Sequence, residues 1–435
     1  MLKAPTPGRG ELAAWLSYLE RLHPSAIALG LDRVDAVRAR LGLTLDCPVI
    51  IVGGTNGKGS ICALLECVLR CAGYRVGCYT SPHLLRYNER VRIGAVEVTD
   101  TALVAAFERV EVARGDISLT YFEFGTLAAA LLFEEARLDA AVLEVGLGGR
   151  LDAVNAFDPD CAVIASVGLD HVEYLGDTRE RIGFEKAGIF RTGRPAVVAD
   201  PDPPDSVIEH ARNIHADLFL IDRDFGAQPQ DAEWLYWSWA ARRRGLPRPN
   251  LRGEHQLFNA AAALAALDCL RERLPVHMGA IRRALVEVEL PARFQVLPGR
   301  PAVILDVAHN PHAAERLREN LELMSRQQPG ENAGTTAVFA MLEDKDISGV
   351  AKIVAPCIDR WLIAPLHGPR GTSADQLSAA LAAAGVNAEA IQAFPSIGAA
   401  YLRAKELGGA NDRIVVFGSF RTVSEVLALR RQGLR

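Results

Sequence analysis

The stretch VIIVGGTNGKGS, Val49 to Ser60, constrains this chain most, because an apolar run passes directly into a glycine-rich turn. Four glycines between Gly53 and Gly59 let backbone N–H groups approach an anion without a clash from Cβ atoms. Lys58 would add a positive charge for the outer phosphates of a nucleotide, and a helix beginning here would add its positive end. The stretch therefore predicts a phosphate-binding loop between a strand and a helix. The alternative is a tight strand-to-helix turn with an exposed lysine.

The loop departs from the usual P-loop pattern GxxxxGK[ST]. Gly59 places Ser60 one position beyond the hydroxyl residue that normally ligates Mg²⁺. We therefore expect the hydroxyl ligand of a metal ion to come from another part of the chain.

Short β-branched runs alternate along the chain with helical patterns, which predicts an α/β fold with mostly parallel sheets. Between the first two expected strands, apolar residues recur at the i, i+3, i+4, i+7 spacing of an amphipathic helix, namely Ile61, Leu64, Leu65, Val68 and Leu69. The expected strands of the first half are Pro48–Val52, Arg75–Thr80, Ala140–Val145, Ala162–Val167 and Pro195–Ala199. Those of the second half are Ala302–Val307, Thr336–Met341, Trp361–Ala364 and Arg413–Phe417.

The chain has 435 residues, which is too long for one ordinary core, so two domains are expected. Proline and glycine punctuation marks a linker at 291–299. We expect an N-terminal P-loop ATPase-like domain over 1–290 and a smaller Rossmann-like α/β domain over 300–435.

Composition restricts the possible partners. A hydrophobic content of 49% with 23% charged residues is typical of a soluble globular protein. A net charge of −5 shows no excess of positive charge for binding nucleic acid or an anionic membrane. No apolar run approaches membrane-spanning length, and the first residues lack the apolar core of a signal peptide. We expect a cytoplasmic monomer whose eight cysteines, which form no CxxC pair, are reduced and structural.

Six further motifs follow the glycine-rich loop along the chain. In chain order after GTNGKGS they are SPHLLRYNERVRI, TYFEFGTLAA, EVGLGGRLDAVN, GLDHVEYLG, FEKAGIF and DVAHNP. Together they resemble the bacterial bifunctional dihydrofolate synthase/folylpolyglutamate synthases of the Mur ligase superfamily, from about Leu12 to about Val426. One departure lies at Ala28, where related sequences often carry an acidic residue.

The resemblance implies ATP-dependent ligation of L-glutamate to dihydropteroate and to reduced folates through an acyl phosphate, with ATP as co-substrate and two Mg²⁺ ions. The implied ATP-binding residues are Thr55, Asn56, Gly57, Lys58, Gly59, Ser60, Asn259, Arg293 and Asp306. The implied metal ligands are Ser81, Glu144, His171 and Lys186, the last as a carbamate formed with CO₂. Lys58, Lys186 and His309 are the implied catalytic residues. The residues matching the pterin pocket are Thr120, Tyr121, Phe122, Glu123, Leu151, Asp152 and Ala153.

Plainer interpretations compete with these roles. Glu144 closes an apolar run, so it is either a ligand at the carboxyl edge of a parallel sheet or a solvated strand-end charge. Phe122 and Asp152 fit a buried aromatic and a helix N-cap nearly as well as a pterin pocket. Lys186 has the plain interpretation of a surface lysine paired with a glutamate.

Three functions remain open at this point: the bifunctional ligase, a folylpolyglutamate synthase alone or another Mur-type ligase, and a P-loop module without ligase chemistry. Cell-wall Mur ligases carry a UDP-sugar domain ahead of the P-loop, and the roughly 47 residues before the first strand are too few for that domain. A second α/β domain with its own DVAHNP motif disfavours a simple nucleotide-binding module.

Overall fold

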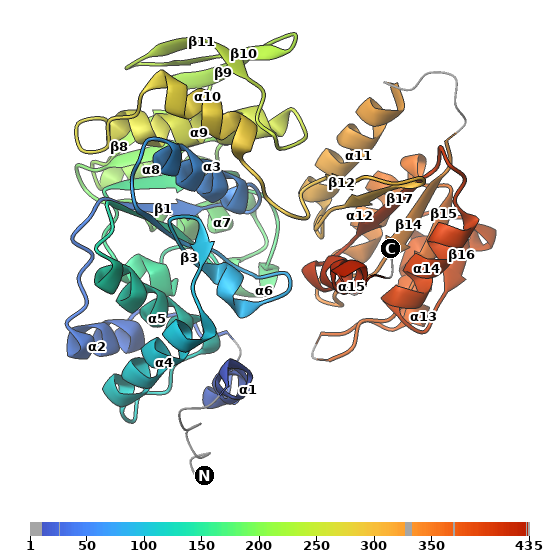
Figure 1. Ribbon diagram of the computed structural model, residues 1–435, viewed down its shortest axis with the longest axis horizontal. Coiled ribbons are helices and arrows are strands. Elements are labelled where there is room, and N and C mark those ends of the chain that lie inside the picture. The colour runs from blue at the N-terminus through green and yellow to red at the C-terminus, as the bar shows by residue number, and fades with distance from the viewer. Residues whose placement is uncertain (1–10, 26, 327–332, 369, 432, 434–435) are drawn as a thin grey trace. The chain divides into compact units, whose positions relative to one another are not determined.

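The computed structural model describes residues 11–25, 27–326, 333–368, 370–431 and 433 (Figure 1). It divides into two compact units. The first unit comprises Met1–Asn250 and Leu257–Val288, and the second comprises Leu251–Gln256 and Glu289–Arg435. Each unit is described by itself below.

The first unit is built on an eight-stranded sheet with the order β4-β3-β2-β5-β1-β6-β7-β8. The strands are β1 (Val49–Gly53), β2 (Val76–Tyr79), β3 (Val91–Ile93), β4 (Val96–Glu97), β5 (Ala140–Glu144), β6 (Cys161–Ile164), β7 (Pro195–Val198) and β8 (Asp217–Leu220). From β2 to β8 the neighbouring strands are parallel, and β3 and β4 form an antiparallel edge. All residues of β1, β2, β5 and β6 are buried, which explains why these strands are readable as continuous apolar runs.

Helices cover both faces of this sheet. They are α1 (Leu12–Leu22), α2 (Asp32–Leu41), α3 (Lys58–Cys71), α4 (Asp100–Arg114), α5 (Tyr121–Ala136), α6 (Val172–Leu175), α7 (Arg179–Ala187), α8 (Asp205–Asn213), α9 (His255–Cys269) and α10 (Met278–Glu287). Helix α3 packs on β1, β2 and β5, and α10 packs on α3 although more than 200 residues separate them in sequence (Figure 1). The predicted helix after the glycine-rich loop is thereby confirmed as α3.

A three-stranded antiparallel sheet completes the first unit, and the sequence did not predict it. Its strands are β9 (Phe225–Gln230), β10 (Glu233–Ser238) and β11 (Arg242–Pro247), in the order β11-β10-β9. The consecutive buried residues in these strands form short runs, Phe225 and Gly226 in β9 and Trp234 to Tyr236 in β10. Strands with such short buried runs carry no long apolar run, so the pattern that reveals the parallel strands is absent here.

The second unit contains a six-stranded sheet with the order β12-β13-β17-β14-β15-β16, parallel except for β12. Its strands are β12 (Gln295–Leu297), β13 (Ala302–Leu305), β14 (Thr335–Phe339), β15 (Arg360–Ile363), β16 (Ile391–Ala393) and β17 (Arg413–Phe417). Its helices are α11 (Pro311–Arg326), α12 (Ile347–Val354), α13 (Ala374–Ala383), α14 (Ile397–Leu407) and α15 (Phe420–Arg431). The predicted α/β class, with a larger parallel sheet and a smaller second sheet, is confirmed.

The segment 291–299 differs from the linker that we predicted. Strand β12 lies inside it and pairs antiparallel with β13, and the whole segment belongs to the second unit. The chain passes between the units after Val288, and the short segment Leu251–Gln256 also belongs to the second unit. Proline and glycine here bracket a short edge strand instead of marking a flexible connection.

Two further expectations concern the chain as a whole. All eight cysteines are free thiols. Over the described ranges, no helix has both the length and the apolarity needed to cross a bilayer.

Candidate active site

The glycine-rich loop joins β1 to α3, as predicted, and is fixed to the segment that follows β6. The Thr55 backbone N–H donates to the Ser166 carbonyl (2.7 Å), and the Asn56 N–H donates to Ser166 Oγ (3.1 Å). Gly54 and Gly57 have φ values of +137° and +90°, which L side chains rarely adopt. The loop is therefore held in one open conformation by a neighbouring strand end.

Lys58 begins α3 and folds back over this loop. Its Nζ donates to the carbonyls of Gly54 (3.0 Å) and Thr55 (3.2 Å). The predicted Asn259, on α9, lies against the same loop, because a Cβ atom on Gly57 would come within 2.7 Å of Asn259 Oδ1. Two segments that are about 200 residues apart in sequence thus meet at the glycine-rich loop.

Three of the predicted metal ligands follow the carboxyl ends of strands near β1 in the sheet. Glu144 is the last residue of β5 and is only 4% exposed, and its Oε2 accepts from the Ser81 backbone N–H (3.1 Å). Ser81 follows β2, the other neighbour of β5. His171 follows β6 and has a left-handed φ of +50°, and its N–H donates to Asp170 Oδ1 (2.9 Å). These strand ends share one edge of the parallel sheet, where ligands bind in open α/β folds.

Lys186 lies on α7, and the structure excludes its interpretation as a surface lysine, since its side chain is buried. Burial and, to a smaller extent, the positive charge of Lys58 lower the pKa of this amine to about 7, although Asp170 and Asp152 act in the opposite direction. At neutral pH a substantial fraction of the amine is therefore unprotonated, as carbamate formation requires.

Asp152 is also buried, and burial raises the pKa of its carboxyl to about 7. Its Oδ2 accepts from the Leu147 N–H (2.8 Å) and its Oδ1 accepts from the Val154 N–H (3.1 Å). The second contact caps the short 3₁₀ helix Ala153–Ala156, so the N-cap interpretation of this residue is realised. Asp152 and Lys186 are thus two buried groups that both titrate near pH 7.

The predicted pocket residues at the start of α5 divide into two kinds. Thr120 and Glu123 are buried and form a capping box, in which Thr120 N–H donates to Glu123 Oε2 (2.7 Å). Arg33 of α2 donates to the same carboxylate at 2.7 Å. These contacts give Thr120 and Glu123 a structural role, whereas Tyr121 and Phe122 between them are only half-buried.

The half-buried aromatic rings lie beside a group of residues that the sequence did not reveal. Phe122 lies 5.7 Å from the ring of Tyr79, and a Cβ atom on Gly146 would meet it at 2.7 Å. The guanidinium of Arg90 lies 5.5 Å from the ring of Tyr121 and donates to His83 Nδ1 (2.9 Å).

Burial and the charge of Arg90 lower the pKa of His83 to about 4, so this imidazole is a neutral acceptor. Both His83 and Arg90 lie in the stretch SPHLLRYNERVRI. The pairing of an arginine with a histidine seven residues earlier was the signal that could have identified them.

The segment before α2 reaches the predicted Leu151. Gly30 N–H donates to the Leu151 carbonyl (3.2 Å), and Arg33 donates to the Ala28 carbonyl (2.6 Å). The backbone around Ala28 therefore lies near both Leu151 and Glu123, although Ala28 itself offers no charge. Ala153, which was also predicted to line the pocket, is buried.

The second unit brings its three predicted residues together at the end of β13. The Asp306 carboxylate accepts from the N–H groups of Phe294 (2.8 Å) and Ala308 (2.7 Å), and burial raises its pKa. Arg293 stacks 5.2 Å from the ring of Phe420, and His309 Nδ1 donates to the Val307 carbonyl (2.8 Å).

The residues on either side of Arg293 are strained. Ala292 and Phe294 have φ values of +60° and +44°. A bulky residue at positive φ is uncommon and marks a backbone held by its surroundings. Here the hydrogen bond from Phe294 to Asp306 holds the backbone that presents Arg293.

Comparisons with known proteins identify relatives of this chain. Residues 52–267 match the Mur ligase middle domain, and residues 292–420 match the Mur ligase, glutamate ligase domain. The chain is 44% identical to the dihydrofolate synthase/folylpolyglutamate synthase of Escherichia coli K12, over 100% of this chain and 99% of the relative.

Solved structures lead to the same family. That of E. coli FolC in complex with DHPP and ADP superposes with a TM-score of 0.92 at 44% identity, over 99% of this chain and 100% of that one. A bifunctional folylpolyglutamate synthase/dihydrofolate synthase from Yersinia pestis, complexed with AMPPNP and a Mn ion, gives 0.90 at 46% identity, over 98% of this chain and 100% of that one. The resemblance noted in the sequence is confirmed, and the chain belongs to the dihydrofolate synthase/folylpolyglutamate synthase family of Mur ligases.

Proposed function

We propose that this protein ligates L-glutamate to dihydropteroate, giving dihydrofolate, and to reduced folates, giving folylpolyglutamates, with ATP as the energy source. The observation that supports this most is the full-length similarity to enzymes of both activities, in a chain that gathers Lys58, Ser81 and Glu144 at adjoining strand ends. The solved relatives hold DHPP with ADP, or AMPPNP with a Mn ion, and thus bind ligands of the type proposed here.

The reaction explains the need for such a site. A carboxylate resists attack by an amine because its oxygen is a poor leaving group. Transfer of the γ-phosphoryl group of ATP to that carboxylate releases ADP and makes an acyl phosphate. The glutamate amine then attacks the acyl carbon, and phosphate leaves with the former carboxylate oxygen. Catalysis therefore depends on aligning two anions and screening their repulsion.

We assign the nucleotide to the glycine-rich loop. The backbone N–H groups from Gly57 to Ser60 would surround the phosphates, while Thr55 and Asn56 hold the loop through their hydrogen bonds to Ser166. Lys58 would leave the carbonyls of its own loop to meet the γ-phosphate. Asn259 lies against the loop and is assigned to the adenine. Arg293 and Asp306 are assigned to ATP, and His309 to catalysis, within the second unit.

A magnesium site fits the residues at the strand ends. The Glu144 carboxylate is buried beside Ser81, and a hard oxygen ligand in a buried position suits Mg²⁺ once phosphates complete the coordination. Ser81, Glu144, His171 and a carbamate on Lys186 would hold two such ions. When bound, Mg²⁺ would neutralise charge on the phosphates.

Lys186 is suited to this role because its amine is partly neutral at pH 7. The amine nitrogen adds to the carbon of CO₂, one proton is lost, and a carbamate anion results. This change converts a buried cation, which a metal would repel, into a long oxygen ligand.

We place the pterin beside the half-buried rings of Tyr121 and Phe122, with Leu151, Asp152 and Ala153 along the pocket. Asp152 accepts two backbone N–H groups already, and a carboxyl with a pKa near 7 remains able to exchange a proton with a ligand. Thr120 and Glu123 are assigned to positioning these rings. Arg90 and His83 are added as neighbours of Tyr121.

The test is phosphate release by the purified protein with ATP, Mg²⁺, dihydropteroate and L-glutamate, each omitted in turn. We expect release only when all four are present, and again when tetrahydrofolate replaces dihydropteroate. Release with tetrahydrofolate but not with dihydropteroate would select a folylpolyglutamate synthase alone, and release with neither would refute both activities. We further propose a cytoplasmic monomer, which sedimentation of the purified protein would test for its oligomeric state.

A further inference from the structure

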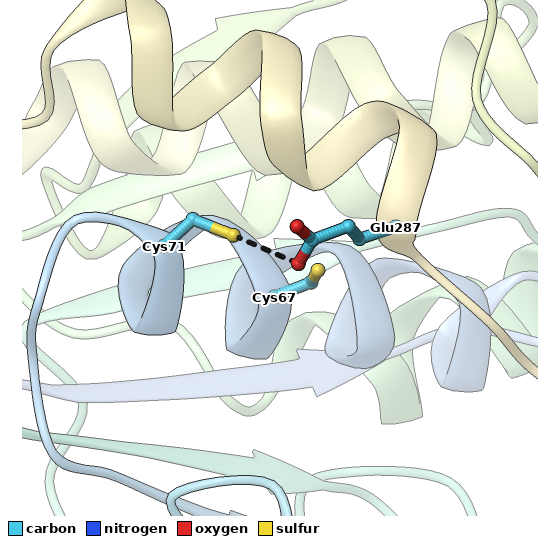
Figure 2. A group of neighbouring side chains, drawn as sticks. All are labelled: Cys67, Cys71 and Glu287. Carbon is cyan, nitrogen blue, oxygen red and sulfur yellow. Dashed lines mark hydrogen bonds between the residues drawn. The ribbon is translucent and has the colours of Figure 1, made fainter.

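A cluster of two thiols and one carboxylate lies between α3 and α10, outside the residues assigned to the reaction. Cys67 and Cys71 are four residues apart on α3, and Glu287 is the last residue of α10. Figure 2 shows the side chains of Cys67 and Cys71 between α3 and α10, with Glu287 beside them. Two sulfur atoms and a carboxylate oxygen all lie within 4.8 Å of one another.

The hydrogen bonds show where the two thiol protons point. Cys67 Sγ donates to the Ala284 carbonyl (3.5 Å), and Cys71 Sγ donates to Glu287 Oε2 (3.7 Å). Both sulfur atoms therefore face α10. Two thiols at i and i+4 on a helix lie on the same face, as do the paired ligands of helical zinc motifs.

We propose that Cys67, Cys71 and Glu287 bind a thiophilic divalent cation of the zinc class, with water as the fourth ligand. Tetrahedral zinc with bonds of about 2.3 Å to sulfur and about 2.1 Å to oxygen requires a sulfur–oxygen separation of about 3.6 Å. The Cys71–Glu287 separation of 3.7 Å already matches this value. Glu287 has a side chain that is 42% exposed, which leaves access for the ion and for the water ligand. Mg²⁺ is disfavoured because two of the three donors are sulfur.

Two arginines lie beside this cluster and add two positive charges to it. Arg70 donates to Cys67 Sγ (3.6 Å) and to Glu287 (2.8 Å), and Arg283 donates to Cys71 Sγ (3.3 Å). Without metal, neutral thiols, one carboxylate and two guanidinium groups give a charge of +1. Binding of one dication with loss of both thiol protons leaves the charge at +1. The arginines then serve as donors to the ligand sulfurs, as the outer contacts of metal sites do.

The probe is Co²⁺, added to chelator-treated full-length protein in the presence of excess Mg²⁺. Thiolate ligands give Co²⁺ an intense near-ultraviolet charge-transfer absorption, which oxygen and imidazole ligands do not produce. We expect one Co²⁺ per chain with this absorption, displacement by Zn²⁺, and release of two protons per ion. Burial raises the pKa of Cys67 to about 11, and the facing groups are Arg70, Arg283 and Glu287. The affinity should therefore rise by up to about 100-fold per pH unit near neutrality.

Matched variants separate this site from other thiols. Cys71→Ser should abolish the absorption, Glu287→Gln should weaken binding by about tenfold or more, and Cys357→Ser in the second unit should change nothing. Arg283→Gln should weaken binding by about tenfold. Its neighbour Arg282, which instead donates to the Arg244 carbonyl, provides the control Arg282→Gln with unchanged binding.

The outcomes that overturn the proposal are equally specific. Absence of the absorption in the folded wild-type protein refutes the site, as does an absorption that persists in Cys71→Ser. A Cys67–Cys71 disulfide found by mass spectrometry in place of metal binding, under conditions that keep Cys357 reduced, also refutes it. Tighter binding by Arg283→Gln would contradict the role of that arginine as an outer donor.

Discussion

Lys58 and Lys186 show how far the surroundings of a residue decide its chemistry. Lys58 lies over its own loop, and its Nζ donates to the carbonyls of Gly54 and Thr55, which we propose a phosphate replaces. Lys186 is buried, and the charge of Lys58 helps to lower its pKa to about 7. One side chain is thus placed to supply a positive charge, and the other is placed to lose one.

Lys58→Ala should remove the charge that we propose meets the outer phosphates and leave the apolar faces of α3 intact. We expect the rate of phosphate release to fall by at least about 100-fold, the loss typical for one preorganised donor to transition-state charge. Lys352→Ala, an exposed lysine on α12, is the control and should keep the normal rate. A folded Lys58→Ala variant, by circular dichroism, with a near-normal rate would place this loop outside the active site.

Lys186→Met should make the protein more stable and nearly inactive. The folded pKa of about 7 lies below the usual value of 10.5, so between these pH values the unfolded state binds more protons. The contribution of Lys186 to stability therefore rises with pH across that window and is most unfavourable at pH 7 and below. Because each pKa unit corresponds to about 1.4 kcal/mol, we expect Lys186→Met to raise the unfolding free energy by roughly 2–4 kcal/mol at pH 7.

Urea unfolding at pH 7 and at pH 9, in CO₂-free buffer without metal so that Lys186 keeps its free amine, tests this expectation, with Lys352→Met as the control. The advantage of Lys186→Met should shrink at pH 9, and equal stability at both pH values would contradict the lowered pKa. Lys186→Ala should regain part of its activity when acetate is added, since a small carboxylate would replace the carbamate. Full activity of Lys186→Ala without acetate would rule out the proposed ligand.

The turn between β1 and α3 needs glycine at position 57 for its backbone conformation and for the close approach of Asn259. A pair of substitutions distinguishes these two requirements. Gly57 and Gly73 have φ values of +90° and +98°, so alanine strains the backbone at both sites by a similar amount, about 1 kcal/mol. A Cβ atom on Gly57 would also meet Asn259 at 2.7 Å, whereas nothing lies within 4 Å of one on Gly73.

Gly57→Ala should therefore weaken ATP binding by at least about tenfold, because the loop or Asn259 must shift by an amount that costs more than about 1.4 kcal/mol. Gly73→Ala should bind ATP normally. Titration with a fluorescent ATP analogue provides the measurement. Equal affinities for the two variants would show that Asn259 and the loop move apart freely.

Each unit of the whole molecule has its own core. Trp15 is buried among Tyr18, Phe107 and Phe124 in the first unit, and Trp361 is buried against Phe339 and Phe417 in the second. Separate cores predict separable unfolding transitions.

Trp361→Ala should lower the midpoint temperature of one calorimetric transition, and Trp15→Ala should lower that of the other. Each truncation of a buried tryptophan costs about 3–5 kcal/mol of local stability. Addition of ATP and Mg²⁺ should raise the midpoint temperature of the transition that Trp15→Ala lowers, because the glycine-rich loop belongs to the first unit. A single transition that both substitutions shift equally would show that the two units unfold together.

The sequence by itself determined the parts of this protein that depend on local pattern. Parallel strands buried on both faces require apolar runs, so β1, β2, β5 and β7 were predicted to within one residue at each end, and β6 ends three residues earlier than predicted. A phosphate loop requires glycines, so the loop from Gly53 to Ser60 was readable as well. The family, and with it the ligand assignments, followed from motifs in order along the whole chain.

The tertiary structure alone decided features that depend on residues far apart in sequence. The carboxylate of Glu123 is bound by Arg33, 90 residues away, and it also caps a helix, so two of its contacts depend on the fold. Strand β12 became part of a sheet only because β13 lies beside it. The pKa of Lys186 depends on burial and on Lys58, which no local pattern records. Hydrogen bonds, desolvation and charge act through space, and the spacing of residues along a chain does not specify which of them become neighbours.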